Sequence, residues 1–135
     1  MEIITQSAQQ TQKLGEKIGR DLKPPVIITL YGELGSGKTT FIQGLAKGLG
    51  IKKRITSPTF VFIKKYQPNF YHIDLYRIEQ TKEVKSLGLE EIFSEPKAVI
   101  AIEWAKKIKE ILPKKRIDIW FNYLNNNKRR ILIKD

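Results

Sequence analysis

The sequence predicts an α/β fold of three layers, in which helices flank a mixed, mainly parallel central sheet with an antiparallel edge. The apolar runs 26–31 and 98–104 are typical of strands buried on both faces, as in a parallel sheet. Segments with helical periodicity alternate with these strands, which favours helices packed on the sheet. At 135 residues the chain has the length of one domain. We therefore expect a single domain over 1–135.

The first predicted helix follows Ser7. Ser7 and Gln10 have the spacing of a capping box, in which two side chains satisfy free backbone groups at the start of a helix. Apolar residues recur every four positions from Leu14 to Leu22, so one stripe of this helix is apolar. We expect the helix to cover the sheet and to end before Pro24.

The strand 26–31 runs into a glycine-rich loop, after which the pattern becomes helical at Lys38. Apolar residues then lie on one stripe from Phe41 to Leu49. Gly50 follows as a stop signal. A second helix is therefore predicted between Lys38 and Gly50.

The middle of the chain has the composition of strands. Residues 59–66 and 70–76 are rich in β-branched and aromatic side chains and are separated by Gln67-Pro68-Asn69, which predicts a hairpin. The following segment, 81–93, has a helical pattern that is broken around Gly88. We expect a helix there with an interruption at the glycine.

The C-terminal third is predicted to complete the sheet. The strand 98–104 is followed by a helical segment that ends near Pro113. RIDIWFNY (116–123) and RRILIK (129–134) then alternate as strands and are joined by a short turn, which predicts a closing hairpin. This hairpin would supply the antiparallel edge.

The loop GELGSGKT, residues 32–39, matches the phosphate-binding pattern G-x-x-x-x-G-K-[ST] at every required position. Its glycines let backbone N–H groups point at phosphate oxygens, and the helix that follows presents its positive end. Lys38 would neutralise the β- and γ-phosphates, and the Thr39 hydroxyl would hold Mg²⁺. A glycine-rich turn without a ligand is the alternative, but strand, loop and helix occur in the order that a P-loop NTPase requires. The residues expected to bind ATP are Glu33, Leu34, Gly35, Ser36, Gly37, Lys38, Thr39 and Thr40.

Two carboxylates are candidates to complete the Mg²⁺ site, which in P-loop proteins uses an acidic residue at the end of a neighbouring strand. Glu103 comes directly after the buried run of the strand 98–104, at the edge of the sheet where ligands bind. Asp74, in YHIDLYR, shares a predicted strand face with His72 and Tyr76. Asp74 could instead form an ordinary salt bridge on a solvated face. The residues alone do not separate these interpretations.

Two further features have both a functional and an ordinary interpretation. Ser57-Pro58-Thr59-Phe60 lies where many P-loop proteins have a segment that senses the γ-phosphate, although a simple Ser-Pro turn has the same sequence. Trp104 follows Glu103 and would usually be a packing residue. Neither feature determines a function by itself.

Composition excludes several classes of protein. With no cysteine and one histidine, the chain has neither a disulfide framework nor the ligands of a typical zinc centre. Its apolar runs fall short of the ~20 residues that cross a bilayer. The polar start, which contains Glu2, does not resemble a secretory signal. We therefore expect a cytoplasmic protein with no membrane partner.

The formal net charge is +11, and the positive surplus is greatest in residues 97–135. This basic third could face RNA or an acidic protein, or it could be a solvated lysine-rich surface. No aromatic RNA-binding signature accompanies it. The chain also lacks the Asn-Lys-x-Asp element that reads guanine and an arginine-rich lid, which disfavours an ordinary GTPase and a small-molecule kinase.

Five segments make the chain resemble the TsaE family of bacterial P-loop ATPases: GELGSGKTTF, SPTF, YHIDLYR, LGLEEIF and IEW, in this order and at suitable spacings. The resemblance covers most of the chain. It implies a Mg²⁺-dependent enzyme with ATP as its substrate, acting in the machinery that makes threonylcarbamoyladenosine in tRNA. The implied partners are the proteins TsaB and TsaD, whose complex would be reset by ATP hydrolysis. The tRNA itself would be approached only within that larger complex.

The resemblance also implies roles for single residues. Lys38 and Thr39 would serve the phosphates and Mg²⁺, and Glu103 would share the metal. Asp74 would act close to it, so Lys38, Asp74 and Glu103 are the expected catalytic residues.

Ser57, Thr59 and Trp104 are implied as switch or interface residues. The sequence departs from the family after Trp104, where Ala105-Lys106-Lys107 replaces a common proline or acidic residue, so polar contacts there are not transferred. For the adenine, the segments 5–8 and 128–129 are candidates without a motif.

Two other functions are compatible with the residues alone. A small-molecule or nucleoside kinase would transfer the γ-phosphate to an acceptor faster than to water. A basic RNA-binding scaffold that merely keeps a P-loop would bind RNA in a salt-sensitive way that nucleotide does not alter.

Overall fold

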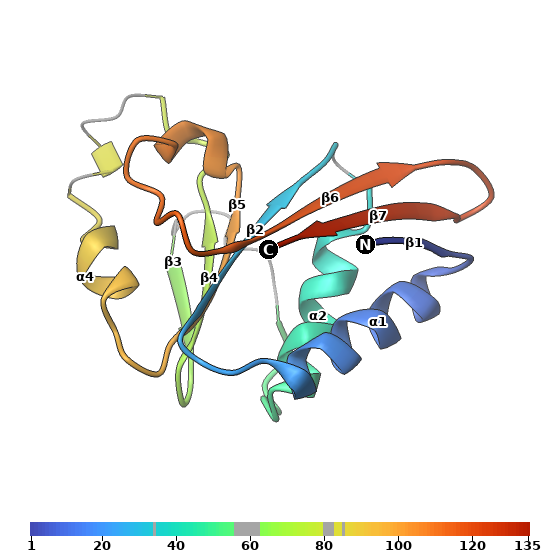
Figure 1. Ribbon diagram of the computed structural model, residues 1–135, viewed down its shortest axis with the longest axis horizontal. Helices are drawn as coiled ribbons and strands as arrows, with labels where there is room; N and C mark the ends of the chain where they lie inside the picture. Colours follow the sequence, from blue (N-terminus) through green and yellow to red (C-terminus); the bar gives the residue numbers. More distant parts are fainter. Residues whose placement is uncertain (34, 56–62, 80–82, 85) are drawn as a thin grey trace.

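The computed structural model describes residues 1–33, 35–55, 63–79, 83–84 and 86–135. These residues form one seven-stranded sheet with the strand order β1-β7-β6-β2-β5-β4-β3 (Figure 1). The strands are β1 (Glu2–Thr5), β2 (Val26–Tyr31), β3 (Ile63–Tyr66), β4 (Phe70–Asp74), β5 (Val99–Glu103), β6 (Ile117–Tyr123) and β7 (Arg129–Lys134).

The sheet is parallel at its centre and antiparallel at both edges. β2 pairs in parallel with β5 and β6, and β4 pairs in parallel with β5. The predicted hairpins form β3–β4 and β6–β7, and β1 adds a second antiparallel pair to β7. The mixed α/β architecture predicted from the sequence is confirmed, while the strand at residues 2–5 was not predicted.

Two long helices cover one face of the sheet, as Figure 1 shows: α1 (Ala8–Asp21) and α2 (Lys38–Gly48). Ser7 caps α1 as predicted, since its Oγ accepts from the N–H of Gln10 at 3.1 Å. The two helices pack at glycines: a Cβ atom on Gly15 would lie 2.3 Å from the carbonyl oxygen of Phe41, and one on Gly44 would lie 1.9 Å from that of Gln12. Backbone therefore packs against backbone, which holds the start of α2 firmly against the sheet.

On the other face, α4 (Leu89–Phe93) and the 3₁₀ helix η1 (Ala105–Ile108) pack against the half of the sheet formed by β5, β4 and β3 (Figure 1). The predicted interruption at Gly88 is confirmed, because this residue has φ of 70° and directly precedes α4. Within the predicted span 81–93, residues 83–84 and α4 are helical, and 81, 82 and 85 lie outside the described residues. None of the described helices has the length and apolar character needed to cross a bilayer.

The prediction of a regular helix from the end of β5 to Pro113 is wrong. Trp104 has the left-handed φ of 61°, and only Ala105–Ile108 is helical, as a 3₁₀ turn. The apolar residues Ala105, Ile108 and Ile111, all packed in the core on this face, are three positions apart. Such a spacing suits the three residues per turn of a 3₁₀ helix better than an α-helix.

The strand predicted over 70–76 also ends early, at Asp74. The N–H of Leu75 donates to the carbonyl of Glu103 at 3.2 Å, and the N–H of Ile78 then donates back to Leu75 at 3.0 Å. The chain turns here, so Tyr76 does not continue the strand face of His72 and Asp74.

Alternating side chains of the central strands build two cores, one on each face. In β2, Ile28 and Leu30 belong to the core beneath α1 and α2, whereas Ile27 packs in the core beneath α4 and η1. This explains the uninterrupted apolar run, because both faces of β2 are covered.

Candidate nucleotide-binding site

The glycine-rich loop connects the carboxyl end of β2 to the first residue of α2. Gly35 and Gly37 have φ of 78° and 107°, values that favour glycine. The loop is closed by a hydrogen bond from the N–H of Ser36 to the carbonyl of Glu33 at 3.1 Å. The first N–H groups of α2 have no acceptor within the helix and carry its positive end, so the loop and helix together form an anion-binding geometry. Leu34 lies outside the described residues.

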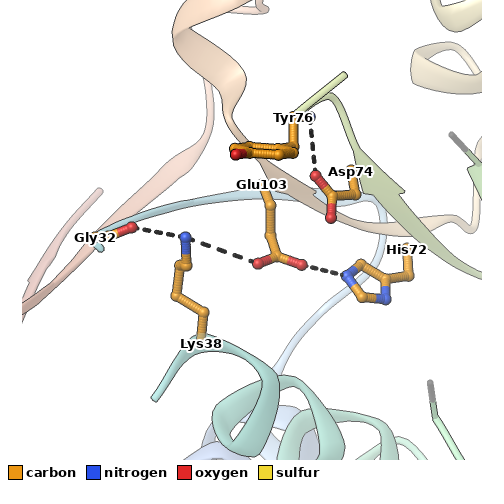
Figure 2. A network of polar contacts seen from close by, with 6 residues as sticks. All are labelled: Gly32, Lys38, His72, Asp74, Tyr76 and Glu103. Carbon is orange, nitrogen blue, oxygen red and sulfur yellow. Dashed lines mark hydrogen bonds and ion pairs between the residues drawn. The ribbon is translucent and has the colours of Figure 1, made fainter. Parts of the chain in front are cut away.

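Lys38 is the first residue of α2 and is only 5% exposed. Its Nζ donates to the carbonyl of Gly32 at 2.7 Å and lies 3.9 Å from Oε1 of Glu103 (Figure 2). The same nitrogen lies 5.1 Å from the ring centre of Trp104. The buried ammonium group is therefore balanced by one carboxylate, one carbonyl and an aromatic face.

Glu103 ends β5 and is also 5% exposed. Its carboxylate lies between two cationic or polar groups: Oε1 faces Lys38, and Oε2 is 2.7 Å from Nε2 of His72 (Figure 2). His72 comes from β4, the neighbouring parallel strand. The buried carboxylate therefore has two partners, which come from α2 and β4.

Asp74 is the residue of β4 that pairs in register with Glu103 of β5. Its Oδ1 accepts from the N–H of Tyr76 at 3.0 Å. Burial raises the pKa of Asp74 above the ordinary value, and the nearby Glu103 carboxylate raises it further, while the hydrogen bond from Tyr76 and the positive charge of Lys38 act in the opposite direction. The two carboxylates that competed for one role on sequence grounds thus lie side by side.

The residues predicted to hold Mg²⁺ offer oxygen atoms, the ligands that this cation prefers. Thr39 lies in the first turn of α2, next to Lys38, and Glu103 supplies the carboxylate at the sheet edge. Ser36 Oγ is buried and has no hydrogen-bond partner among the described atoms. No group of three or more His, Cys, Asp and Glu residues in the described part of the chain could hold a metal by itself. The metal site of a P-loop protein does not need such a group, because hydroxyl, phosphate and water oxygens supply most of its ligands.

Trp104 lies beside Lys38 and packs against Tyr76, with 5.1 Å between the ring centres. Lys107 connects the two segments that follow β4 and β5. Its Nζ donates to the carbonyls of Tyr76 and, at 2.8 Å, Ile78. The segment after Asp74 and the segment after Glu103 are therefore held together beside the loop. Ser57 and Thr59, the two other predicted switch residues, lie outside the described residues.

Three residues near the loop were not assigned a role from the sequence, or only as part of a segment. His72 contacts Glu103, and Lys107 joins the two segments beyond the strands. Arg129, in the turn considered for the adenine, runs past the loop: a Cβ atom on Gly37 would lie 3.3 Å from its Nε. That Nε is buried without a hydrogen-bond partner among the described atoms. The alternation of His72 with Asp74 was the one local signal for any of these contacts.

Comparison with known proteins identifies relatives across nearly the whole chain. The family model described as "Threonylcarbamoyl adenosine biosynthesis protein TsaE" matches residues 5–131. The tRNA threonylcarbamoyladenosine biosynthesis protein TsaE of Bacillus subtilis is 39% identical over 130 residues, which cover 94% of this chain and 80% of that protein. The protein of the same name from Treponema pallidum is 35% identical over 135 residues, with 98% and 99% covered.

A solved structure agrees with these sequences. The crystal structure of YdiB from Bacillus subtilis superposes with a TM-score of 0.79 at 34% sequence identity. The match covers 97% of this chain and 82% of YdiB. The similarity therefore extends over the sheet, the loop and the helices that carry the site.

Proposed function

The chain belongs to the TsaE family, and from this premise we propose that it is a Mg²⁺-dependent ATPase that supports the TsaB–TsaD complex in tRNA threonylcarbamoyladenosine biosynthesis. The observation that carries the proposal is the cluster of the buried Lys38 and Glu103 with the half-buried Asp74 beside the glycine-rich loop. Two carboxylates and a lysine at the carboxyl edge of a parallel sheet are the groups that phosphoryl transfer needs.

Phosphate binding uses the loop and Lys38. Backbone N–H groups of the loop and of the first turn of α2 receive the phosphate oxygens, and Lys38 turns its Nζ from Gly32 and Glu103 to the β- and γ-phosphates. The phosphates of the nucleotide then balance the positive charge of Lys38, which Glu103 balances when no nucleotide is bound. Because the lysine is buried, its electrostatic contribution is stronger than that of an exposed side chain.

Thr39 and Glu103 hold Mg²⁺ in this proposal, Thr39 through its hydroxyl and Glu103 through its carboxylate. The ion, when bound, offsets the charge that develops on the phosphate oxygens. Glu103 suits this task because β5 fixes its backbone and two neighbours fix its carboxylate.

Asp74 orients the attacking water and accepts its proton. Burial and the adjacent Glu103 raise the pKa of Asp74, which makes its carboxylate a stronger base than an exposed aspartate. Because Asp74 and Glu103 come from neighbouring strands in register, the residue that would hold the metal and the residue that would orient the water lie next to each other.

A change in the bound nucleotide would alter the partner-binding surface through Trp104 and Lys107. Trp104 lies against Lys38, the residue that changes partners when phosphate binds. Lys107 joins the segment of Trp104 to the carbonyls of Tyr76 and Ile78, and the Tyr76 side chain is 51% exposed. A shift of Lys38 thus has a contact route to an exposed aromatic residue, which is where we place the contact with TsaB–TsaD.

The decisive experiment measures phosphate release from ATP without an acceptor, together with capture of TsaB and TsaD in ATP, in ADP and without nucleotide. We expect Mg²⁺-dependent hydrolysis and partner binding that differs between the nucleotide states. Transfer of phosphate to a small acceptor faster than to water would replace the proposal with a kinase. Salt-sensitive RNA binding that nucleotide does not change, without partner binding, would replace it with the scaffold function.

A further inference from the structure

His72 is the one histidine of the chain, and its side chain is completely buried. Its Nε2 lies 2.7 Å from Oε2 of Glu103, whereas Nδ1 has no hydrogen-bond partner among the described atoms. The ring therefore has one polar contact in the described part of the structure, and this contact is to the carboxylate at the end of β5 (Figure 2).

The direction of this hydrogen bond follows from the chemistry of the two groups. An ionised carboxylate only accepts, so Nε2 carries the proton and donates. Nδ1 has no hydrogen-bond partner among the described atoms. The one hydrogen bond of the ring in the described structure is therefore the one that it donates to Glu103.

Lys38 and His72 share the Glu103 carboxylate, but only one of them has to leave it. Lys38 is 3.9 Å from Oε1 and is required by the phosphates when ATP binds. Once Lys38 turns away, a carboxylate that is 5% exposed would have no partner except His72. A buried carboxylate without a partner is costly and reorients toward whatever donor it can reach.

We propose that His72 is a positioning residue, which holds Glu103 through Oε2 so that Oε1 stays turned toward the site when Lys38 exchanges the carboxylate for phosphate. This inference rests on the proposed function, since it concerns how Glu103 is presented to Mg²⁺. Groups that hydrogen-bond to metal-binding side chains typically change metal affinity 10- to 100-fold when they are removed. His72 is the group that donates such a hydrogen bond to Glu103.

The test compares His72→Leu with His72→Gln. Leucine fills the buried space without a donor, whereas the glutamine amide can donate from nearly the same position as Nε2. Titration calorimetry measures Mg²⁺ binding to the ADP complex, and a second titration measures ADP binding in EDTA. We expect His72→Leu to weaken Mg²⁺ binding about 10-fold or more, to leave ADP binding in EDTA unchanged, and His72→Gln to recover most of the loss.

Tyr71→Phe is the matched control. Tyr71 is the neighbouring residue of β4, and its hydroxyl donates to Glu95 at 2.6 Å, away from Glu103. Losing that hydrogen bond perturbs the same strand and should leave Mg²⁺ affinity unchanged. If Tyr71→Phe weakens Mg²⁺ binding as much as His72→Leu does, a general disturbance of β4 explains the result and the inference fails.

A second comparison remains available if His72→Leu does not fold. The side chain of His72→Asn is too short to reach Glu103, while that of His72→Gln reaches it, and both are polar. Equal Mg²⁺ affinities for these two variants would overturn the inference. In the Glu103→Ala background, which has no side-chain acceptor at this position, His72→Gln and His72→Asn should bind Mg²⁺ alike; a difference there would show that His72 acts on something other than Glu103. If the unaltered protein binds neither ADP nor Mg²⁺, the proposed function itself is wrong.

Discussion

Asp74 and Glu103 are partners in the parallel register of β4 and β5, so two carboxylates end neighbouring strands at the same level of the sheet. Two carboxyl groups on adjacent strands resist being ionised together, because their charges repel. The environments of the two groups differ: Glu103 faces Lys38 and His72, whereas Asp74 accepts one backbone hydrogen bond.

Asp74→Asn should stabilise the protein near neutral pH and abolish most hydrolysis. The pKa of Asp74 is raised in the folded state, so its ionisation favours unfolding as pH rises through the folded pKa, and the contribution is absent below the unfolded pKa. We expect the variant to melt at a higher temperature than the unaltered protein at pH 7, and the gap to close as the pH falls to the ordinary pKa of an aspartate. Hydrolysis should fall about 10²–10⁴-fold. Thermal unfolding across pH and phosphate release measure the two effects; a gap that widens in acid would contradict the sign.

Lys38→Ala should remove nucleotide binding and hydrolysis together. The variant deletes the charge that faces the phosphates and leaves Glu103 with His72 alone. We expect ATP affinity to fall by about 10-fold or more, since a charge-assisted contact to phosphate is worth about 1.5–3 kcal/mol. Lys47→Ala, an exposed lysine of the same helix, is the control. Calorimetric titration with ATP measures both variants, and unchanged binding by Lys38→Ala would refute the phosphate site.

Lys107→Ala should uncouple the nucleotide from the partner. The change removes the bonds that tie the segment after Trp104 to the carbonyls of Tyr76 and Ile78. We expect ATP affinity to stay within about twofold, while the difference in TsaB–TsaD affinity between ATP and ADP shrinks severalfold, as loss of about 1 kcal/mol of coupling would produce. Lys109→Ala, an exposed neighbour, should keep the difference. Partner titrations in each nucleotide test this, and an undiminished difference would exclude the route through Lys107.

Gly44→Ala should destabilise the fold. A Cβ atom there would lie 1.9 Å from the carbonyl oxygen of Gln12, so α1 and α2 would have to separate. Overpacking of this kind typically costs about 1–3 kcal/mol, although alanine favours a helix over glycine. Urea unfolding measures the change, with Gln43→Ala in the same helix as control. A more stable Gly44→Ala variant would show that the helices separate without cost.

The sequence alone is sufficient to predict the glycine-rich loop, because the loop is formed by consecutive residues of the chain. The central strands and both long helices were also predicted, since an uninterrupted apolar run and an apolar period of about four residues are local properties. The sequence pattern missed one strand and wrongly predicted one regular helix, in both cases where tertiary contacts compete with local pattern. β1 is four residues long and is a strand because its backbone pairs with β7. The segment after Trp104 is 3₁₀ because Ala105 and Ile108 are buried three residues apart.

In the candidate site, too, some features follow from local sequence and others only from the tertiary structure. Lys38, Asp74 and Glu103 were each chosen from short motifs, and the loop, strand and helix order around Lys38 is visible in the chain itself. That Asp74 and Glu103 are register neighbours, that His72 donates to Glu103 and that Lys107 reaches Tyr76 was decided by the order of the strands. Local interactions determine which segments become strands; strand order, set by burying both faces of the sheet at once, determines which side chains meet.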